Sequence, residues 1–562
     1  MKLPRVFVLS IFFCFNVLMA SSEGLAAANE ETTSAEKGQF TLAVRRLTES
    51  QYRHTIDDIF GAGIEINARF EPEQREAGLL AVGSSKLSIT ASGFEQHVAL
   101  ATSIATQVLS EEKRATLMRC EPAAAEEFDA TCARQFLSTY GELLFRRPLS
   151  EAEIESRLAI ASAGARQTGD FYVGLQLALS SLLIAPEFLF RIERAEPDPV
   201  DSGSLRLDGY SKATRLSFFF WNTAPDRELL EVAGNGGLHT EQGLLAQIRR
   251  LSESPRMEAG VQAFLIDMMQ IEGFENMVKD PAIYPKFNQL IADSAREQMV
   301  RTIMDLLVTR ERDYRELFTS RETFINRPLA AVYQVPFAST EAWTAYTFPE
   351  SSERVGIFSQ IGFLALFSHP GTSSPTRRGI KIHEIFLCEP TPDPPADVDF
   401  SQVVDSTAGT VRGRLLDHMQ NTGCTVCHQR SDPPGLALEH FDGLGQLRTM
   451  ENGSLIDDSA ELFGRTLQGA QGVAQFLYED SRVPACLVRN LYAYGVARRP
   501  DAGEQTYFRS QVETFAENGY RVPGLFEQIA ASPEFFKVVL PEGLKVRATA
   551  LTDGVMAGPD QQ

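Results

Sequence analysis

Apolar residues recur every three to four positions along most of the chain, the spacing that places them on one face of a helix. The first such stretch, TESQYRHTIDDIFG, has a capping box in which Thr48 is the N-cap and Gln51 stands three residues on. Gly61 is expected to end this helix. Its predicted apolar face carries Tyr52, Ile56, Ile59 and Phe60.

The same pattern continues downstream, with prolines between the helices. GFEQHVALATSIATQVL predicts a second amphipathic helix, and Pro148 is expected to end another one. Ser150 and Glu153 form a capping box for the helix that follows. FYVGLQLALSSLLIAPEFLFRIER is apolar on most sides, which predicts a buried helix ending near Pro186. Its apolar run is too short to cross a bilayer.

Alternation of apolar and polar residues with a period of two is rare, so the predicted fold class is mainly α. The pair Asn452-Gly453, between two short alternating runs, predicts one β-hairpin. At 562 residues the chain is too long for one core, which favours a multi-domain helical protein. The linker-like stretches EPDPVDSGSLRLDG and EPTPDPPADVD are expected at domain junctions.

These features predict seven segments. They are a signal peptide at 1–28, an N-terminal helical domain at 29–110, a helical domain with an FRRPL motif at 111–195, a helical domain at 205–345, a domain with a CxxCH motif at 350–450, a C-terminal helical domain at 451–545 and a flexible tail at 546–562.

The first residues have the features of a secretory signal. Lys2 and Arg5 precede the apolar run VFVLSIFFCFNVLMA, and small residues follow at Ala20-Ser21-Ser22. An uncleaved anchor is the alternative, although the run is short for a span. No second stretch is long and apolar enough to cross a bilayer. We therefore expect a periplasmic or secreted protein with no transmembrane segment once the signal is removed.

The charge narrows the choice of partners. Lys and Arg number 53 against 74 Asp and Glu, which gives a formal net charge of −21. A field of this sign repels nucleic-acid phosphates, so nucleic acid is not an expected partner.

Export changes how the cysteines are interpreted, because free thiols rarely persist in an oxidising compartment. Seven cysteines minus Cys14 leave six. If Cys424 and Cys427 hold a cofactor, the other four allow three pairings. We favour Cys120 with Cys132 and Cys388 with Cys486, while buried free thiols remain an alternative. The first pair is close in sequence, and the second would tie the CxxCH region to the segment after it.

The sequence CTVCH at 424–428 carries the most specific chemistry. In a CxxCH motif the two thiols attach covalently to haem, and the histidine is a ligand of the iron. On one helical turn, Cys424, Cys427 and His428 share a face. A chance occurrence in this chain has a probability on the order of 0.001. We therefore predict a small c-type cytochrome-like segment that binds one covalent haem c.

Three other uses of these residues stay open. A thioredoxin-like redox pair needs a strand–helix context that the region lacks. A zinc site needs a further Cys or His pair, which is absent downstream. A disulfide across two residues is strained.

The sixth ligand of the iron is less defined. His418 lies ten residues before His428 and is the first candidate. Met419, Met450 and His369 are alternatives.

The acids Asp432, Glu439 and Asp442, near Arg448, suggest either a calcium-like cluster or, more simply, loop-capping carboxylates and an Arg–carboxylate pair. GxSxG, HExxH and P-loop signatures are absent.

Several motifs in order resemble one family. They are RRLTESQYRHTIDDIFG, CARQFLSTYGELLFRRPLSEAE, SSLLIAPEFLFRIE with RLSFFFWNTAPDRELLEVAGNGGL, SSPTRRGIKIHEIFLCEPTPDPPADV with CTVCHQRSDPPGLALEHFDGLGQLR, and CLVRNLYAYGVARRP. The chain resembles large exported cytochrome-like proteins of planctomycetes and proteobacteria, built of consecutive domains of unknown function with one CxxCH motif.

This resemblance implies a mostly helical protein outside the cytoplasm, with the haem motif at Cys424, Cys427 and His428. His418 falls where such proteins often have a histidine. The chain departs from the family pattern at His440, where asparagine is more usual, and at Gln334, where glycine is more usual.

Three functions follow as hypotheses. The first is a c-type cytochrome-like protein that exchanges electrons with a periplasmic partner. The acidic surface of this protein would suit docking to a basic partner. The second is a haem-dependent oxidoreductase, of peroxidase or oxygenase type. The third is a non-haem binding or scaffold protein. Whether the protein is an enzyme stays open at this level.

Overall fold

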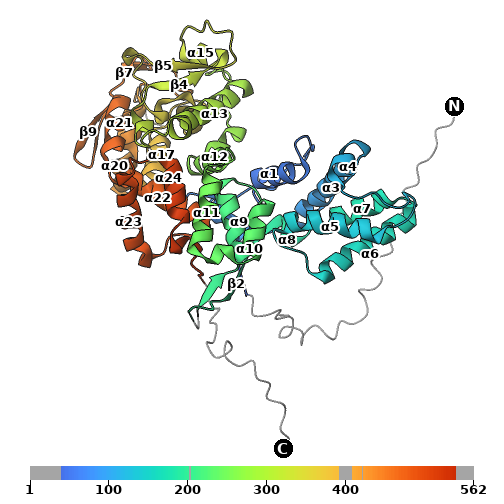
Figure 1. The fold of residues 1–562 in the computed structure, drawn as a ribbon. Helices are drawn as coiled ribbons and strands as arrows, with labels where there is room; N and C mark the ends of the chain where they lie inside the picture. The colour runs from blue at the N-terminus through green and yellow to red at the C-terminus, as the bar shows by residue number, and fades with distance from the viewer. Residues whose placement is uncertain (1–39, 202–203, 392–407, 421, 540–562) are drawn as a thin grey trace, which may run out of the picture.

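The protein is described by a computed structural model over residues 40–201, 204–391, 408–420 and 422–539. The fold is mainly helical, as predicted, with a few short antiparallel strand pairs. Helices α3 to α7 extend as an arm from a larger body formed by the later helices (Figure 1). In the described part, no helix has the length and apolarity needed to span a membrane. The predicted signal peptide and tail lie outside the described residues.

The N-terminal helices follow the sequence prediction closely. The capping box of Thr48 and Gln51 and the C-cap at Gly61 are both confirmed, as is the capping box of Ser150 and Glu153. The bounds are α1 Glu49–Phe60, α2 Leu80–Gly83, α3 Ala91–Val108, α4 Glu111–Leu117, α5 Ala130–Phe145, α6 Glu151–Thr168, α7 Phe171–Leu183 and α8 Pro186–Leu189.

The remaining helices build the larger body. In its first half they are α9 Gly209–Phe220, α10 Arg227–Gly234, α11 Glu241–Ser252, α12 Met257–Met268, α13 Gln289–Met304, α14 Glu316–Thr319 and α15 Arg327–Tyr333. In its second half they are α16 Ile361–Leu366, α17 Pro375–Leu387, α19 Val411–His418, α20 Thr422–Leu436, α21 Gly469–Glu479, α22 Arg482–Val496, α23 Gln505–Glu517 and α24 Val522–Ala530.

Two hydrophobic cores correspond to the arm and the body. The core of the arm lies within 47–189 and is joined by Phe218 from α9. The core of the body draws on residues from Leu79 to Phe536. The predicted domain boundaries are finer than this division and stay predictions.

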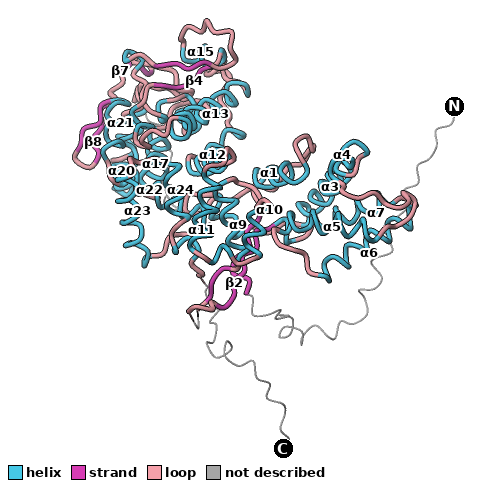
Figure 2. Tube along the Cα trace, viewed as in Figure 1, coloured by secondary structure: helices cyan, strands magenta, loops and turns pink. Residues whose placement is uncertain are grey.

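The strands are short and scattered among the helices (Figure 2). Hairpin β6–β7, Met450–Glu451 with Ser454–Leu455, confirms the turn predicted at Asn452-Gly453. Both turn residues have positive φ, 47° and 80°, as a two-residue hairpin loop requires. Two further antiparallel strand pairs were not predicted: β4 Glu322–Ile325 with β5 Thr344–Thr347, which are separated by α15, and the hairpin of β8 Ser459–Leu462 with β9 Arg465–Gln468.

A three-stranded antiparallel sheet was also not predicted. It is formed by β1 Phe40–Arg46, β2 Phe190–Pro197 and β3 Leu205–Leu207, with β2 in the middle. The buried helix predicted to end near Pro186 is confirmed as α7, which ends at Leu183; the short α8 then begins at Pro186, and the chain enters β2 at Phe190. The partner strand β1 lies far away in the sequence, so local patterning carries no sign of the pairing.

A buried charge cluster joins this sheet to the C-terminal helices. The carboxylate of Glu193 on β2 accepts from Arg45 at 3.0 Å and from Arg215 at 2.6 and 2.9 Å. Arg45 also donates to the carbonyl of Val496 at 2.6 Å, and Arg215 donates to the carbonyl of Phe535. Burial opposes ionisation of Glu193, but Arg215 and Arg45 outweigh it and lower its pKa to about 2.

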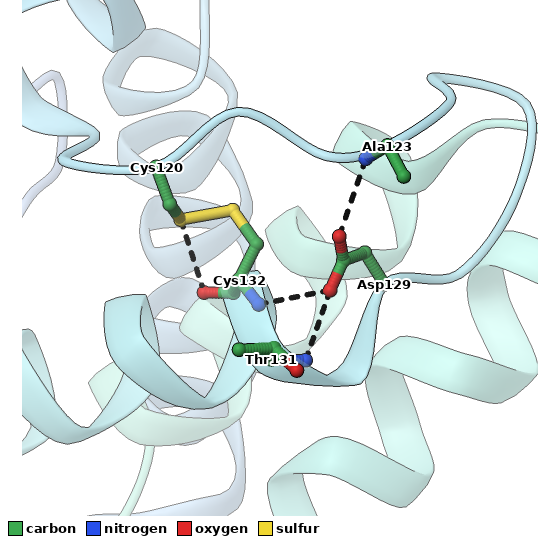
Figure 3. The surroundings of a disulfide bond; sticks show 5 residues. All are labelled: Cys120, Ala123, Asp129, Thr131 and Cys132. Carbon is green, nitrogen blue, oxygen red and sulfur yellow. Dashed lines mark hydrogen bonds between the residues drawn. A yellow bond between two sulfur atoms is a disulfide. The ribbon is translucent and has the colours of Figure 1, made fainter.

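Two disulfides confirm the favoured cysteine pairing. Cys120 is bonded to Cys132 at the start of α5, where Asp129 accepts from the backbone N–H groups of Ala123, Thr131 and Cys132 (Figure 3). The second disulfide joins Cys388, the C-cap of α17, to Cys486 in α22.

Candidate functional site

The CxxCH motif lies on the first turns of α20, as expected for a motif on one helical turn. Cys424 is partly exposed, Cys427 is exposed, and both are free thiols. The two-residue disulfide considered from the sequence is therefore not formed here. The apolar side chains of Val426 between the cysteines and Leu416 on α19 are 75% and 55% exposed. The motif thus presents accessible thiols and apolar surface together.

His428 is held in one orientation by a buried carboxylate. Its Nδ1 lies 2.8 Å from Oδ2 of Asp432, one helical turn further along α20. The Asp432 side chain is only 2% exposed, whereas that of His428 is 17% exposed. A carboxylate at Nδ1 favours the tautomer with the proton on that atom, which leaves the lone pair on Nε2.

His418 is the candidate sixth ligand that the structure brings to His428. The two rings lie 5.1 Å apart between centroids and nearly perpendicular, at 85°. His418 is buried, and its Nδ1 has no hydrogen-bond partner among the described residues. Burial lowers the pKa of His418, and the neighbouring His428 lowers it further. Of the other candidates, Met450 lies on β6 and is 51% exposed, and the backbone carbonyl of Met419 accepts from the Thr425 hydroxyl at 2.7 Å.

Helix α20 is supported from behind by α17, and the two cross at glycines. A Cβ atom at Gly379 would lie 1.7 Å from the carbonyl oxygen of Ser431. A Cβ atom at Gly435 would lie 1.8 Å from the carbonyl oxygen of Pro375. The backbones can approach this closely only because neither position carries a side chain.

The same crossing buries an arginine completely. Arg378 of α17 is 0% exposed and donates to the carbonyls of Leu438 at 3.2 Å, Phe441 at 2.8 Å and Leu364 at 3.2 Å. Carbonyl oxygens thus satisfy most of a guanidinium that would otherwise be costly to bury. This arginine fixes the loop that follows α20.

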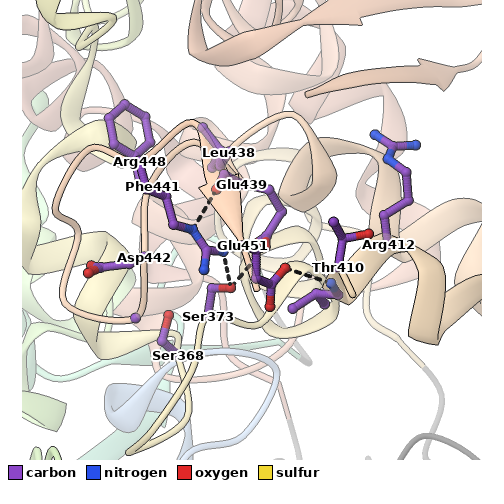
Figure 4. A network of polar contacts seen from close by, with 12 residues as sticks. Ser368, Ser373, Thr410, Arg412, Leu438, Glu439, Phe441, Asp442, Arg448 and Glu451 are labelled. Atoms are coloured by element: carbon purple, nitrogen blue, oxygen red, sulfur yellow. Dashed lines mark hydrogen bonds and ion pairs between the residues drawn. The ribbon is translucent and has the colours of Figure 1, made fainter. Parts of the chain in front are cut away.

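The acids that follow the motif have separate structural partners. Glu439 is buried and accepts from Ser373 at 2.9 Å and from Arg448 at 2.8 Å (Figure 4). Burial raises the pKa of Glu439, although Arg378 and Arg448 oppose this. Asp442 caps its own loop by accepting from the backbone N–H groups of Leu444 and Gln446. The simpler interpretation holds for Glu439, which pairs with Arg448, and for Asp442, which caps a loop; the three acids do not gather around one point in the described part.

The structure corrects the sequence interpretation of the residues after the motif. Pro433 and Pro434 belong to α20, which continues to Leu436. Proline normally interrupts a helix, and the acids interleaved with these prolines were interpreted from the sequence as loop-capping carboxylates. The packing of α17 along this segment stabilises the helix by more than the loss of two backbone N–H donors destabilises it. Asp432 was singled out from the sequence only as one of the acids after the motif. Its contact with His428 was missed, and the spacing of four on one helix was the available signal.

Five family models match consecutive parts of the chain, and each describes a protein of unknown function. They are DUF1587 over 45–110, DUF1595 over 132–193, DUF1592 over 207–335, DUF1588, also named PSCyt3, over 354–451, and DUF1585 over 463–535. The chain is an array of five consecutive domains of unknown function. The candidate site lies within the DUF1588 domain. No curated protein and no solved structure is similar enough to match this chain.

Proposed function

We propose that this protein is an exported c-type cytochrome-like protein that carries one covalent haem and exchanges electrons with a partner. Cys424 and Cys427 would attach the haem, and His428 would be its proximal ligand. The observation that carries the proposal is the hydrogen bond from His428 to the buried Asp432, beside two free thiols on the same turn.

The residues fit the group in three respects. The thiols are accessible and unpaired, so both are available for covalent attachment. His428 has its Nδ1 occupied by Asp432, which is the arrangement that orients a metal-ligating histidine and raises its basicity. His418 adds a second imidazole, buried and with Nδ1 unpartnered among described residues. When bound, haem supplies a one-electron redox centre whose potential depends on its axial ligands.

The protein's own residues would do three things in this function. Asp432 holds the proton on Nδ1 of His428 and keeps the ring from turning. The crossing of α17 and α20 at Gly379 and Gly435 keeps the helix that carries the motif rigid. The motif lies at the surface, where Cys427 and Val426 are exposed, so a partner protein can approach closely.

Electron transfer and export rest on further observations. A net charge of −21 favours a basic partner through electrostatic steering. The two disulfides suit an oxidising compartment, in keeping with the predicted signal peptide at 1–28.

A haem stain on a denaturing gel, with a pyridine haemochrome spectrum, tests the attachment. The full chain would be produced in an exporting host with c-type maturation machinery, beside Cys424→Ala/Cys427→Ala. Covalent haem is expected in the wild type and not in this variant. Val426→Ala is the matched control, because it changes the same turn but keeps CxxCH, and it should retain haem. A folded wild-type protein without haem would overturn the proposal in favour of a non-haem binding or scaffold role.

A second measurement separates electron transfer from oxidoreductase chemistry. If His418 closes the sixth position, the reduced protein should bind carbon monoxide poorly, and His418→Ala should bind it readily. Strong binding by the wild type would favour an open site and the haem-dependent oxidoreductase.

A further inference from the structure

A second cluster of potential ligands lies apart from the CxxCH residues. It comprises Glu353, which follows a short 3-10 helix at Glu350–Ser352, His440, which follows α20, and Asp458, which precedes β8. One donor atom from each residue lies within 4.8 Å of the other two. Nδ1 of His440 is 2.7 Å from Oε2 of Glu353 and 3.4 Å from Oδ2 of Asp458.

The charges in this cluster are not balanced by protein cations. Two carboxylates face one another across a single ring nitrogen, and like charges this close repel. In residues 40–201, 204–391, 408–420 and 422–539, no lysine or arginine forms an ion pair with Glu353 or Asp458. One N–H group cannot satisfy two carboxylates fully. The arrangement therefore favours an additional positive charge between them.

The backbone is hydrogen-bonded to neighbouring segments at His440 and Asp458, and the side chain of Asp458 has a further partner. The carbonyl of His440 accepts from the N–H group of Arg448 at 2.7 Å, and the side chain of His440 is 17% exposed. The carbonyl of Asp458 accepts from Gly469 at 3.1 Å, and its Oδ1 accepts from Gln468 at 2.5 Å. Glu353 is 44% exposed, so water has access to the cluster from that side.

We propose that Glu353, His440 and Asp458 bind one divalent transition-metal ion, with Zn²⁺ preferred. Imidazole nitrogen is a ligand for zinc, copper, iron and nickel, whereas calcium and magnesium prefer oxygen donors alone. Three protein ligands with one position left to water is an arrangement that zinc adopts. Zn²⁺ also binds mixed nitrogen and oxygen donors more tightly than Mn²⁺ does.

A metal ion here would connect three segments that are distant in sequence. These are the loop before α16, the loop that follows α20 and the segment that leads into β8. His440 is one of the two positions at which the chain departs from the pattern it resembles. The ion would thus stabilise the surroundings of α20 independently of haem.

Isothermal titration calorimetry on the full chain tests this site. The chain would carry Cys424→Ala/Cys427→Ala, so that thiolates do not bind the metal, and would be treated with a chelator before titration with Zn²⁺, Mn²⁺ or Ca²⁺. We expect one equivalent of Zn²⁺ and a rise in melting temperature on binding. His440→Asn and Asp458→Asn should each weaken Zn²⁺ binding by at least about 10-fold, the smaller of the losses typical for an outer-shell partner.

Asp457→Asn is the control, since it removes the same charge from the neighbouring residue and should leave Zn²⁺ binding unchanged. If the variants fold poorly, the intact cluster is tested by modifying histidines with diethylpyrocarbonate and measuring the His440 peptide by mass spectrometry. Zn²⁺ should protect His440. Absence of stoichiometric Zn²⁺ binding, binding that survives both His440→Asn and Asp458→Asn, or unprotected His440 would each overturn the proposal. A site that prefers Ca²⁺ and ignores His440→Asn would overturn it too.

Discussion

Gly379 in α17 and the carbonyl of Ser431 in α20 lie so close that a Cβ atom on residue 379 would stand 1.7 Å from the oxygen. Backbone cannot move aside as a flexible side chain can. The helix that carries CTVCH can therefore pack this closely against α17 only because residue 379 has no side chain.

Gly379→Ala should destabilise the fold by about 1–3 kcal/mol or more, because it overpacks a tight contact. The matched control is Gly524→Ala, at an exposed position of α24, where nothing lies within 4 Å of the added Cβ. This control should be neutral or stabilising by up to about 1 kcal/mol, since alanine favours helix. Chemical denaturation of both variants measures the difference. Equal stability of the two would contradict the close crossing.

Glu193→Gln should cost about 3–5 kcal/mol at neutral pH, because it leaves Arg45 and Arg215 buried without their carboxylate. The folded pKa is about 2 against an ordinary value of 4.5. The carboxylate therefore stabilises the fold above about pH 4.5, and this contribution is lost as the pH falls from 4.5 towards 2. The stability gap between wild type and variant should shrink over that interval.

Thermal melts at a series of pH values would measure this gap. Glu95→Gln, at an exposed position of α3, is the control and should change stability little at any pH. A gap that stays constant between pH 5 and pH 2 would contradict the lowered pKa of Glu193.

The two disulfides should differ in their contribution to stability. Cys388–Cys486 closes a loop of 98 residues, whereas Cys120–Cys132 closes one of 12. On loop entropy alone, replacing the first pair by serine should cost about 5 kcal/mol and the second about 3 kcal/mol. Denaturation of the two double-serine variants gives the order directly, and a larger loss for Cys120→Ser/Cys132→Ser would contradict it.

Gln334→Gly should stabilise the protein by roughly 0.5–1 kcal/mol. Gln334 is the C-cap of α15 and has φ 57° and ψ 41°, a left-handed conformation that is costly for residues with a Cβ. Gln334→Ala keeps the Cβ and serves as the control, so it should bring no gain. Melting temperatures of the two variants separate the two effects: a gain only in Gln334→Gly shows that the left-handed backbone was strained, whereas equal gains in both variants would show that removal of the side-chain amide is responsible.

Asp432→Ala should raise the reduction potential of the haem-loaded protein. Without the carboxylate at Nδ1, His428 becomes a less basic ligand that stabilises the oxidised iron less. Asp432→Asn keeps a hydrogen-bond acceptor without the charge, so it should shift the potential less. Redox titration followed by visible absorbance measures both. An unchanged potential in Asp432→Ala would show that this carboxylate has only a structural role.

The sequence by itself determined the helical fold class, the capping boxes at Thr48 and Ser150, the Asn452-Gly453 hairpin and the placement of CTVCH on a helix. These features depend on interactions within a few residues, so local patterning is enough to predict them. The favoured disulfides also held, because few pairings were possible.

Tertiary structure alone decided the rest. Strand β2 follows the arm in the sequence and pairs with β1, which precedes it; α20 continues through Pro433 and Pro434; and Glu353, His440 and Asp458 meet from three separate segments. Each of these features depends on packing between segments that are distant in the sequence, so local patterning gives no sign of it. Long-range packing supplies the free energy that overrides local preference at such places.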